Sequence, residues 1–237
     1  MSKVLIVPDV HGRTFWKYAK NHVDEFDKVV FLGDYLDPYP HEHISFDDAV
    51  QNFKQILDFK NKNKDKVVLL LGNHDMHYYN TGFMDCSRMN YARREEMYHL
   101  YTGWDFFNLA YIYDNYLFSH AGVYTEWLEE NDLTLDDLID DNAIERCMPA
   151  LSDVSYWRGG CCDAGSCIWS DIRESSNRHP DTTYYQIVGH TQLADEPYRT
   201  PKIACLDVRK CFLLDTETKE ITSIGYNSNS DENTSNK

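Results

Sequence analysis

The chain contains five short polar motifs, and each lies just after an apolar run with the composition of a β-strand. Open α/β sheets place their ligands beyond the carboxyl ends of their strands, so residues in such positions come together at one edge. The order of the motifs therefore constrains the fold as well as the site. The motifs are Asp9-Val10-His11-Gly12, Gly33-Asp34-Tyr35-Leu36-Asp37, Gly72-Asn73-His74-Asp75, Ser119-His120-Ala121-Gly122 and Gly189-His190-Thr191.

The first half of the sequence predicts alternating strands and helices. Short β-rich runs occupy Lys3–Val7, Lys28–Leu32 and Lys66–Leu71, and the last is nearly all apolar, as in a strand covered on both faces. Between them, residues 12–22 are expected to be helical. Apolar residues then recur at helical spacing across residues 45–64, with Ser45 as the predicted cap. This alternation predicts βαβ units and an α/β fold.

The second half predicts one more helix, at 91–101, and several short strands. Asp114-Asn115 is expected to form a two-residue hairpin turn between strands 110–113 and 116–119. The acidic segment 126–145 is predicted as two exposed helices, the second capped by Thr134. The irregular segment 147–181 is expected to be a lid or specificity loop. Further strands are predicted at Tyr185–Val188, Ile203–Leu206, Cys211–Leu214 and Ile221–Ile224.

Residues 1–226 are predicted to form one domain, and residues 227–237, which lack apolar anchors, a disordered tail. No run approaches the 18 apolar residues of a membrane helix, and Pro8-Asp9 interrupts the first apolar run too early for a signal peptide. A cytoplasmic protein that does not bind membranes is expected. The seven cysteines are too irregularly spaced for a disulfide framework, and Cys161, Cys162 and Cys167 are interpreted as free thiols.

The net charge of −16 limits the classes of partner. It makes nucleic acid an unlikely partner, because tight binding to a nucleic-acid backbone requires Lys and Arg to neutralise phosphates. A phosphate ester is still an acceptable substrate, since bound cations can dominate the local charge.

The residue types in the five motifs indicate a metal site. Carboxylate, imidazole and amide ligands suit divalent first-row metals rather than a thiolate site. Two carboxylate motifs, an Asn and three further His are more than one ion needs. The economical interpretation is two metal ions that share a bridging Asp, an arrangement used for displacement at phosphorus.

The order and wording of the motifs resemble the calcineurin-like metallophosphoesterases, and most of all the branch of serine/threonine protein phosphatases and bacterial diadenosine tetraphosphate hydrolases. The resemblance spans residues 9 to about 215 and implies a four-layer αββα sandwich of two mixed sheets flanked by helices. It implies two divalent ions, Mn²⁺ first and Fe, Zn or Mg as alternatives, with a hydroxide bound to both as nucleophile. Its metal ligands would be Asp9, His11 and Asp34 for the first ion, and Asp34, Asn73, His120 and His190 for the second.

The same resemblance implies a general acid. It casts His74 as the group that protonates the leaving oxygen, with Asp37 fixing its orientation and raising its basicity. Asp75 stands where protein phosphatases have Glu, and it is expected to support the site without taking part in the chemistry.

The chain departs from this branch at Pro38, where the family has an Arg that clamps phosphate. Arg158, Arg13 and Arg173 are the candidate replacements in the sequence. Arg158 is the first choice, because the two glycines after it permit close approach of the backbone to a ligand.

The substrate class stays open in the sequence. Gln192 stands where many metallophosphoesterases have a second His, and Ile168-Trp169-Ser170-Asp171 resembles a segment of protein phosphatases. Ser119-His120-Ala121-Gly122 is instead similar to the dinucleotide hydrolases. The leading hypothesis is a metal-dependent phosphoesterase acting on a phosphoprotein, a nucleotide or a small phosphoester. A pyrophosphohydrolase of dinucleoside polyphosphates is the alternative, and a scaffold without turnover is disfavoured because every ligand is retained.

Overall fold

Two mixed β-sheets form the centre of this computed structural model, which describes residues 2–181 and 183–224. The first sheet has the order β11-β10-β1-β2-β3-β4, and its strands β1 to β4 are parallel. Strand β10 pairs antiparallel with β1, and β11 pairs antiparallel with β10. The bounds are β1 (Lys3–Val7), β2 (Lys28–Phe31), β3 (Val67–Leu70), β4 (Phe107–Asn108), β10 (Cys211–Asp215) and β11 (Glu220–Ile224). The predicted tail at 227–237 lies outside the described residues.

The second sheet has the order β5-β6-β7-β9-β8, with β6, β7 and β9 parallel. Its strands are β5 (Ala110–Tyr113), β6 (Tyr116–Ser119), β7 (Tyr185–Val188), β8 (Tyr198–Arg199) and β9 (Ile203–Cys205). The predicted hairpin is confirmed, since Tyr113 pairs with Tyr116 across the Asp114-Asn115 turn.

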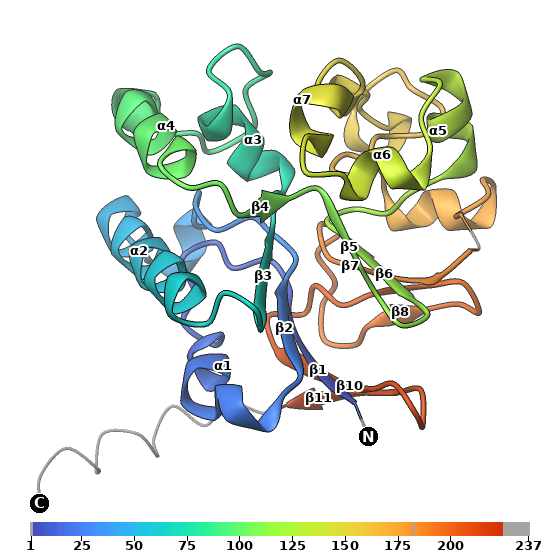
Figure 1. Ribbon diagram of the computed structural model, residues 1–237. Helices are drawn as coiled ribbons and strands as arrows, with labels where there is room; N and C mark the ends of the chain where they lie inside the picture. Colours follow the sequence, from blue (N-terminus) through green and yellow to red (C-terminus); the bar gives the residue numbers. More distant parts are fainter. Residues whose placement is uncertain (1, 182, 225–237) are drawn as a thin grey trace, which may run out of the picture.

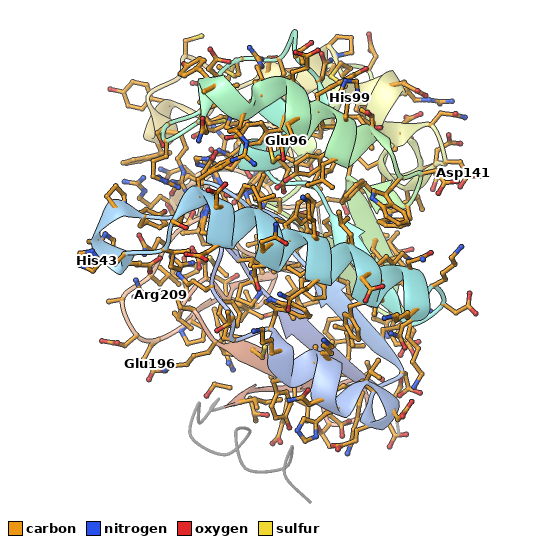
Figure 2. The ribbon with its side chains drawn as sticks, turned by 90° about the vertical axis from the view of Figure 1, so that its left-hand side faces the viewer. His43, Glu96, His99, Asp141, Glu196 and Arg209 are labelled. Atoms are coloured by element: carbon orange, nitrogen blue, oxygen red, sulfur yellow. The ribbon has the colours of Figure 1, made fainter. Side chains whose placement is uncertain are left out.

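Alternating side chains of the first sheet bury themselves on its two faces. Val4 and Ile6 of β1 pack with Phe118 of the second sheet in one core. Leu5 and Val7 belong to a larger core on the other face, which contains side chains of the helices α1 (Lys17–His22) and α2 (Phe46–Lys62). Figure 1 shows these helices beside the first sheet, and Figure 2 shows α2 running across it with α4 above. The predicted fold of two mixed sheets flanked by helices is confirmed.

The remaining helices are short and gather near the upper ends of the two sheets in Figure 1. They are α3 (Asn73–Tyr79), α4 (Arg94–Thr102), α5 (Thr125–Glu130), α6 (Leu135–Ile139) and α7 (Ala143–Cys147). Ser45 caps α2 by accepting a hydrogen bond from Asp48 N at 3.1 Å, as predicted. No helix among the described residues is both long and apolar enough to cross a membrane.

Two sequence predictions about helices were wrong, and one helix was missed. Residues 12–16 are not part of α1, because Gly12 N donates to Tyr35 O (3.0 Å) and holds this stretch against the next motif. The acidic segment contains three helices where two were predicted, since Asp140 is extended and its carboxylate accepts from Asn142 N at 2.8 Å. Helix α3 was not anticipated.

The irregular segment 147–181 begins with the last residue of α7, and beyond it carries no named strand or α-helix, only the short 3₁₀ turns η4 (Ala150–Ser152), η5 (Tyr156–Arg158) and η6 (Ile172–Ser176). Ala121 N, directly beyond β6, donates to Cys167 O at 2.8 Å. This contact joins the segment to the edge at which β1, β2, β3, β6 and β7 end.

Candidate metal centre

The structure brings all six predicted metal ligands together. They lie just beyond β1, β2, β3, β6 and β7, in loops or, for Asn73, at the start of α3, and every one is buried: Asp9, His11, Asp34, Asn73, His120 and His190. Their ligand atoms form two groups, each within 4.8 Å: Asp9, His11 and Asp34 in one, Asp34, His120 and His190 in the other. Asp34 belongs to both groups, as expected for a bridging carboxylate.

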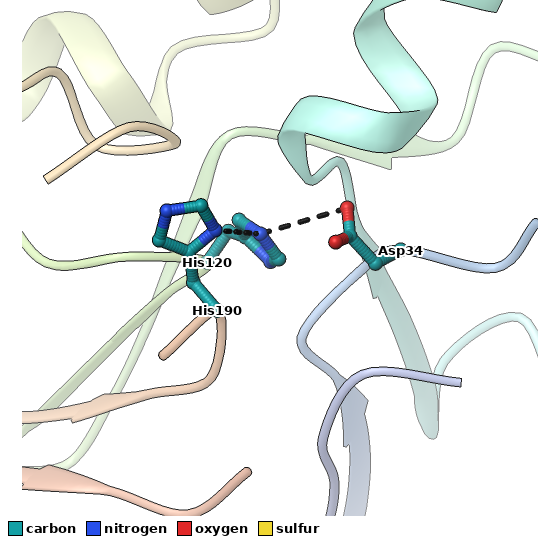
Figure 3. Close-up of side chains that lie close together, drawn as sticks. All are labelled: Asp34, His120 and His190. Carbon is teal, nitrogen blue, oxygen red and sulfur yellow. Dashed lines mark hydrogen bonds and ion pairs between the residues drawn. The ribbon is translucent and has the colours of Figure 1, made fainter. Parts of the chain in front are cut away.

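Figure 3 shows the second group, Asp34, His120 and His190. In this group, nitrogen and oxygen atoms that carry lone pairs face one another. His120 Nδ1 lies 2.7 Å from the carbonyl oxygen of Leu32, which can only accept, so Nδ1 carries the hydrogen and Nε2 offers a lone pair. Yet Nε2 lies 3.1 Å from Asn73 Oδ1 and 3.5 Å from Asp34 Oδ1. A divalent cation would satisfy these acceptors at once.

The first group repeats this pattern. His11 Nδ1 lies 2.7 Å from the carbonyl oxygen of Leu36, so Nε2 again offers a lone pair, and it faces Asp34 Oδ2 at 3.4 Å. Burial, and then the nearby charges of Asp9 and Asp75, raise the pKa of Asp34 well above its usual range. The crowded negative charge therefore requires a proton or a cation.

The imidazoles are held in the form that binds metals. Burial is the main cause that lowers the pKa of His11 and His190 well below the usual value, with further lowering from His74 and Arg158 respectively. Burial also lowers the pKa of His120. Neutral imidazole is the ligating form, so these residues fit a metal at neutral pH.

Four of the site residues have a left-handed backbone, which is rare for residues other than glycine. The φ angles are +44° at His11, +54° at Asp34, +57° at Asp37 and +65° at His190. Such conformations cost roughly 1–3 kcal/mol each and persist where the surroundings determine them. The left-handed conformation at these residues turns the chain so that the side chains of successive loops converge on the candidate metal centre.

Asp75 supplies part of that support. Its buried carboxylate accepts from the backbone N–H groups of Asp34 (2.6 Å), Gly72 (2.7 Å) and Tyr35 (3.0 Å), and from the hydroxyl of Tyr101 (2.6 Å). Burial raises the pKa of Asp75 to about 6 despite these donors. The side chain faces the backbone of two motifs, in agreement with a supporting role.

His74 and Asp37 meet as the resemblance implies. His74 Nδ1 lies 2.8 Å from Asp37 Oδ2, and the Tyr78 hydroxyl donates to Asp37 Oδ1 at 2.7 Å. Burial alone would raise the pKa of Asp37, but interactions with His74 and His77 outweigh it and lower the pKa below its usual range. Asp37 is therefore a carboxylate that holds the ring of His74.

His77 completes this cluster, and the sequence analysis missed it. Its Nε2 lies 2.9 Å from Asp37 Oδ2, at an angle too oblique for a full hydrogen bond. Its Nδ1 accepts from Cys86 N at 3.1 Å, so the single hydrogen of the neutral ring lies on Nε2. That hydrogen excludes a metal at Nε2, so Asp37, His74 and His77 form a buried polar cluster and not a metal site. The three-residue interval between His74 and His77 on a helix was the available signal.

The three arginines predicted to bind phosphate lie in different places. Arg158 lines a pocket of about 330 Å³ together with His11, Asp34, Asn73, His74 and His190. Arg13 and Arg173 are not among the residues that line it. Arg13 Nε pairs with Glu42 at 2.9 Å, and Arg173 Nε pairs with Asp171 at 2.7 Å.

The pocket also contains a cation that the sequence analysis did not consider. Arg88 comes from the loop between α3 and α4, and its guanidinium lies 3.9 Å from the ring centre of Tyr39. It follows Pro38 by fifty positions, so no motif spacing connects it with the site.

Comparisons with known proteins agree with this geometry. The sequence model of the calcineurin-like phosphoesterase family matches residues 2–191. A comparison with curated proteins gives no match. Among solved structures, a cold-active protein-tyrosine phosphatase of Shewanella sp. is similar, with 15% identity, a TM-score of 0.57 and coverage of 95% of this chain and 81% of that one.

A protein serine/threonine phosphatase from Saccharomyces cerevisiae is also similar, with 13% identity, a TM-score of 0.58 and coverage of 97% of this chain and 82% of that one. At such low identity these two structures show the fold alone, whereas the family match covers most of the chain and includes all five motifs. The chain therefore belongs to the calcineurin-like phosphoesterases and is a metallophosphoesterase, an enzyme that hydrolyses phosphoric esters.

Proposed function

We propose that this enzyme hydrolyses phosphomonoesters with two divalent metal ions that share Asp34. The observation that carries the proposal is the convergence of lone pairs on the two sides of that residue. Asp34 Oδ2 faces His11 Nε2, and Asp34 Oδ1 faces His120 Nε2, with neither imidazole nitrogen able to donate. Asp9 completes the first set, and Asn73 and His190 complete the second.

The mixed donor set fits several metals. Carboxylate, imidazole and amide groups suit Mn²⁺, which we propose as the first choice, and also Fe, Zn or Mg, so metal supply decides as much as affinity. Two ions in these sites would lower the pKa of water toward neutrality and neutralise charge on the phosphoryl oxygens.

His74 is the proposed general acid. Because its Nδ1 is engaged by Asp37, its Nε2 is the nitrogen left to face the substrate, and the ring lines the pocket. Burial lowers the pKa of His74, and the Asp37 carboxylate opposes this shift while it fixes the ring orientation. The cluster therefore holds a proton carrier beside the candidate ligands without itself binding a metal.

Exposed aromatic side chains near the pocket support a second candidate function. Tyr156 is 72% exposed and Trp157 is 45% exposed, and both directly precede Arg158, which lines the pocket. Exposed aromatic rings beside a phosphate site could stack a nucleobase. Dinucleoside polyphosphates are therefore the alternative substrate, with pyrophosphate hydrolysis as the reaction.

We also propose a cytoplasmic location. All seven cysteines are free, and five of them are buried without forming a pair: Cys86, Cys147, Cys167, Cys205 and Cys211. Free thiols persist in a reducing compartment.

A substrate panel tests the proposal. We expect Mn²⁺-loaded protein to hydrolyse p-nitrophenyl phosphate or a phosphopeptide with higher kcat/KM than bis-p-nitrophenyl phosphate or diadenosine tetraphosphate. Chelation should abolish activity, and Mn²⁺ should restore it. Full activity in protein shown by mass spectrometry to be metal-free would refute the two-metal mechanism. A preference for diadenosine tetraphosphate would select the alternative.

A further inference from the structure

Two arginines line the pocket of the candidate metal centre, and they are held in different ways. Arg158 already has an ionic partner: its Nε lies 2.9 Å from a carboxylate oxygen of the buried Asp171, at an angle too oblique for a full hydrogen bond, and its Nη2 donates to His190 O at 3.0 Å and to Thr191 Oγ1 at 2.8 Å. These contacts fix the loop that carries His190. Arg158 therefore has a structural use that needs no substrate.

Arg88 is held only by uncharged groups. Its Nε donates to the main-chain oxygen of Asp37 at 3.0 Å, and its Nη1 donates weakly to Ser87 Oγ at 3.3 Å. Two acids line the same pocket: Asp85 pairs with Arg94 at 3.3 Å, and Asp34 is the candidate bridging ligand. Within residues 2–181 and 183–224, Arg88 has no ion pair with a carboxylate. A cation without a counter-charge, in a chain of net charge −16, is suited to an anionic ligand.

The free end of Arg88 points at the reactive edge of His74. Its Nη2 lies 3.3 Å from His74 Nε2, the nitrogen that the cluster with Asp37 leaves available. A guanidinium can only donate, so it uses a neutral imidazole as its acceptor here. A phosphoryl oxygen is a charged and therefore stronger acceptor. Such an oxygen could replace the imidazole without moving the arginine from Tyr39.

The backbone holds Arg88 in place at a cost. Its φ is +65°, a left-handed conformation that a long side chain rarely adopts. The loop is tied on both sides, because Cys86 N donates to His77 Nδ1 and Asn90 N donates to the hydroxyl of Tyr78. Both partners belong to the cluster around Asp37. Backbone strain of this kind gathers at ligand-binding sites.

We propose that Arg88 binds the phosphoryl oxygens of the substrate and takes the place of the cation that Pro38 cannot supply. The inference rests on the proposed phosphoesterase function. In this arrangement Arg88 binds a phosphoryl oxygen of the phosphate ester, and the neighbouring His74 faces the leaving oxygen of the same ester.

The test compares Arg88→Ala, Arg88→Lys and Arg158→Ala with wild-type enzyme loaded with Mn²⁺. Two quantities are measured: kcat/KM for a phosphomonoester, and the Kd of inorganic phosphate by calorimetry, which needs no turnover. Arg209→Ala is the matched control, because Arg209, labelled in Figure 2, also has a left-handed backbone (φ +59°) and donates to a main-chain oxygen, and it is not among the residues that line the pocket.

We expect Arg88→Ala to lower kcat/KM by about 10- to 100-fold and to weaken phosphate binding by a similar factor, the usual effect of losing a charge-assisted hydrogen bond. Arg88→Lys should recover part of both, because an ammonium keeps the charge without the planar fork. Metal content should stay at the wild-type level, and Arg209→Ala should match wild type.

Three results would overturn the inference. Wild-type phosphate binding in Arg88→Ala would show that the residue does not contact phosphate, and a loss confined to Arg158→Ala would assign the role to Arg158. Loss of metal from Arg88→Ala would show a structural role instead. Wild-type protein without metal-dependent activity would refute the proposed function itself, which is a separate outcome.

Discussion

Replacing Asp37 with Asn removes one negative charge from a buried cluster and leaves its shape intact. The Asp37 carboxylate is fully buried, with one hydrogen bond each from His74 and Tyr78 and a close contact from His77. An Asn oxygen can still face both imidazoles, and the Tyr78 hydroxyl can rotate to accept from the new NH₂ group. The variant therefore keeps its contacts, but none of them is charge-assisted.

The expected cost follows from those contacts. Hydrogen bonds to charged groups are worth roughly 1 kcal/mol more than neutral ones, so two bonds and one close contact give a loss of about 2–3 kcal/mol. Against a total stability of about 5–15 kcal/mol, this is a large fraction. With an m-value of about 3 kcal/mol per molar urea, the midpoint of unfolding should fall by close to 1 M.

The assay is urea unfolding of the metal-free protein at pH 7, so that metal loss does not contribute. The pKa of Asp37 is lowered in the fold, so its carboxylate stabilises the protein above the unfolded pKa of about 3.9. This contribution is lost as the pH falls below that value. The difference between wild type and Asp37→Asn should therefore be complete at pH 7 and shrink below about pH 4.

The matched control is Asp58→Asn, since the Asp58 side chain is 56% exposed and forms an ion pair with the exposed Lys62. Exposed ion pairs are worth roughly 0–1 kcal/mol, so this variant should stay near wild type. Equal stability of Asp37→Asn and wild type at pH 7 would show that the cluster does not stabilise an ionised carboxylate.

Two further predictions concern the metal site and its general acid. Asp34→Asn should remove both ions together, measured as metal bound per chain, with loss of activity; retention of one full equivalent would refute the bridging role. His74→Asn should retain metal while kcat falls by roughly 10²–10⁴-fold. The loss should be smaller for p-nitrophenyl phosphate than for an alkyl phosphate, whose leaving group needs protonation, and equal losses would contradict an acid role.

The ligand positions could be predicted because they depend on strand ends. β1, β2, β3, β6 and β7 are short apolar runs, and all five end at one edge of the paired sheets. Parallel pairing brings Asp9 beside Asp34 at the end of the first sheet and His120 beside His190 at the end of the second. Packing of the two sheets against each other then brings the two pairs together. The resemblance supplied the division into two sets, and the shared position of Asp34 agrees with it.

Contacts across loops could not be predicted in this way. Arg88 reaches the site because the loop after α3 folds back onto Tyr39 and the main-chain oxygen of Asp37. The spacing of apolar residues in the sequence does not indicate such a contact between loops. Helix α3 was missed for another reason: it is seven residues long, and its apolar positions give no clear helical repeat. Without that helix, the shared face of His74 and His77 was not visible.

The position of Asp37 explains how a site could lose the arginine at position 38 and still bind phosphate. Its left-handed backbone directs the side chain to His74, while its main-chain oxygen accepts from Arg88 Nε. One residue thus sets the location of both the proposed acid and the proposed phosphate ligand. Asp37 holds Arg88 through its main-chain oxygen, which the substitution Asp37→Asn does not change. This variant should therefore bind phosphate nearly as well as wild type, whereas its kcat should fall because the side-chain contact with His74 is altered. The two functions of this residue are therefore separable by experiment, although they share a single loop position.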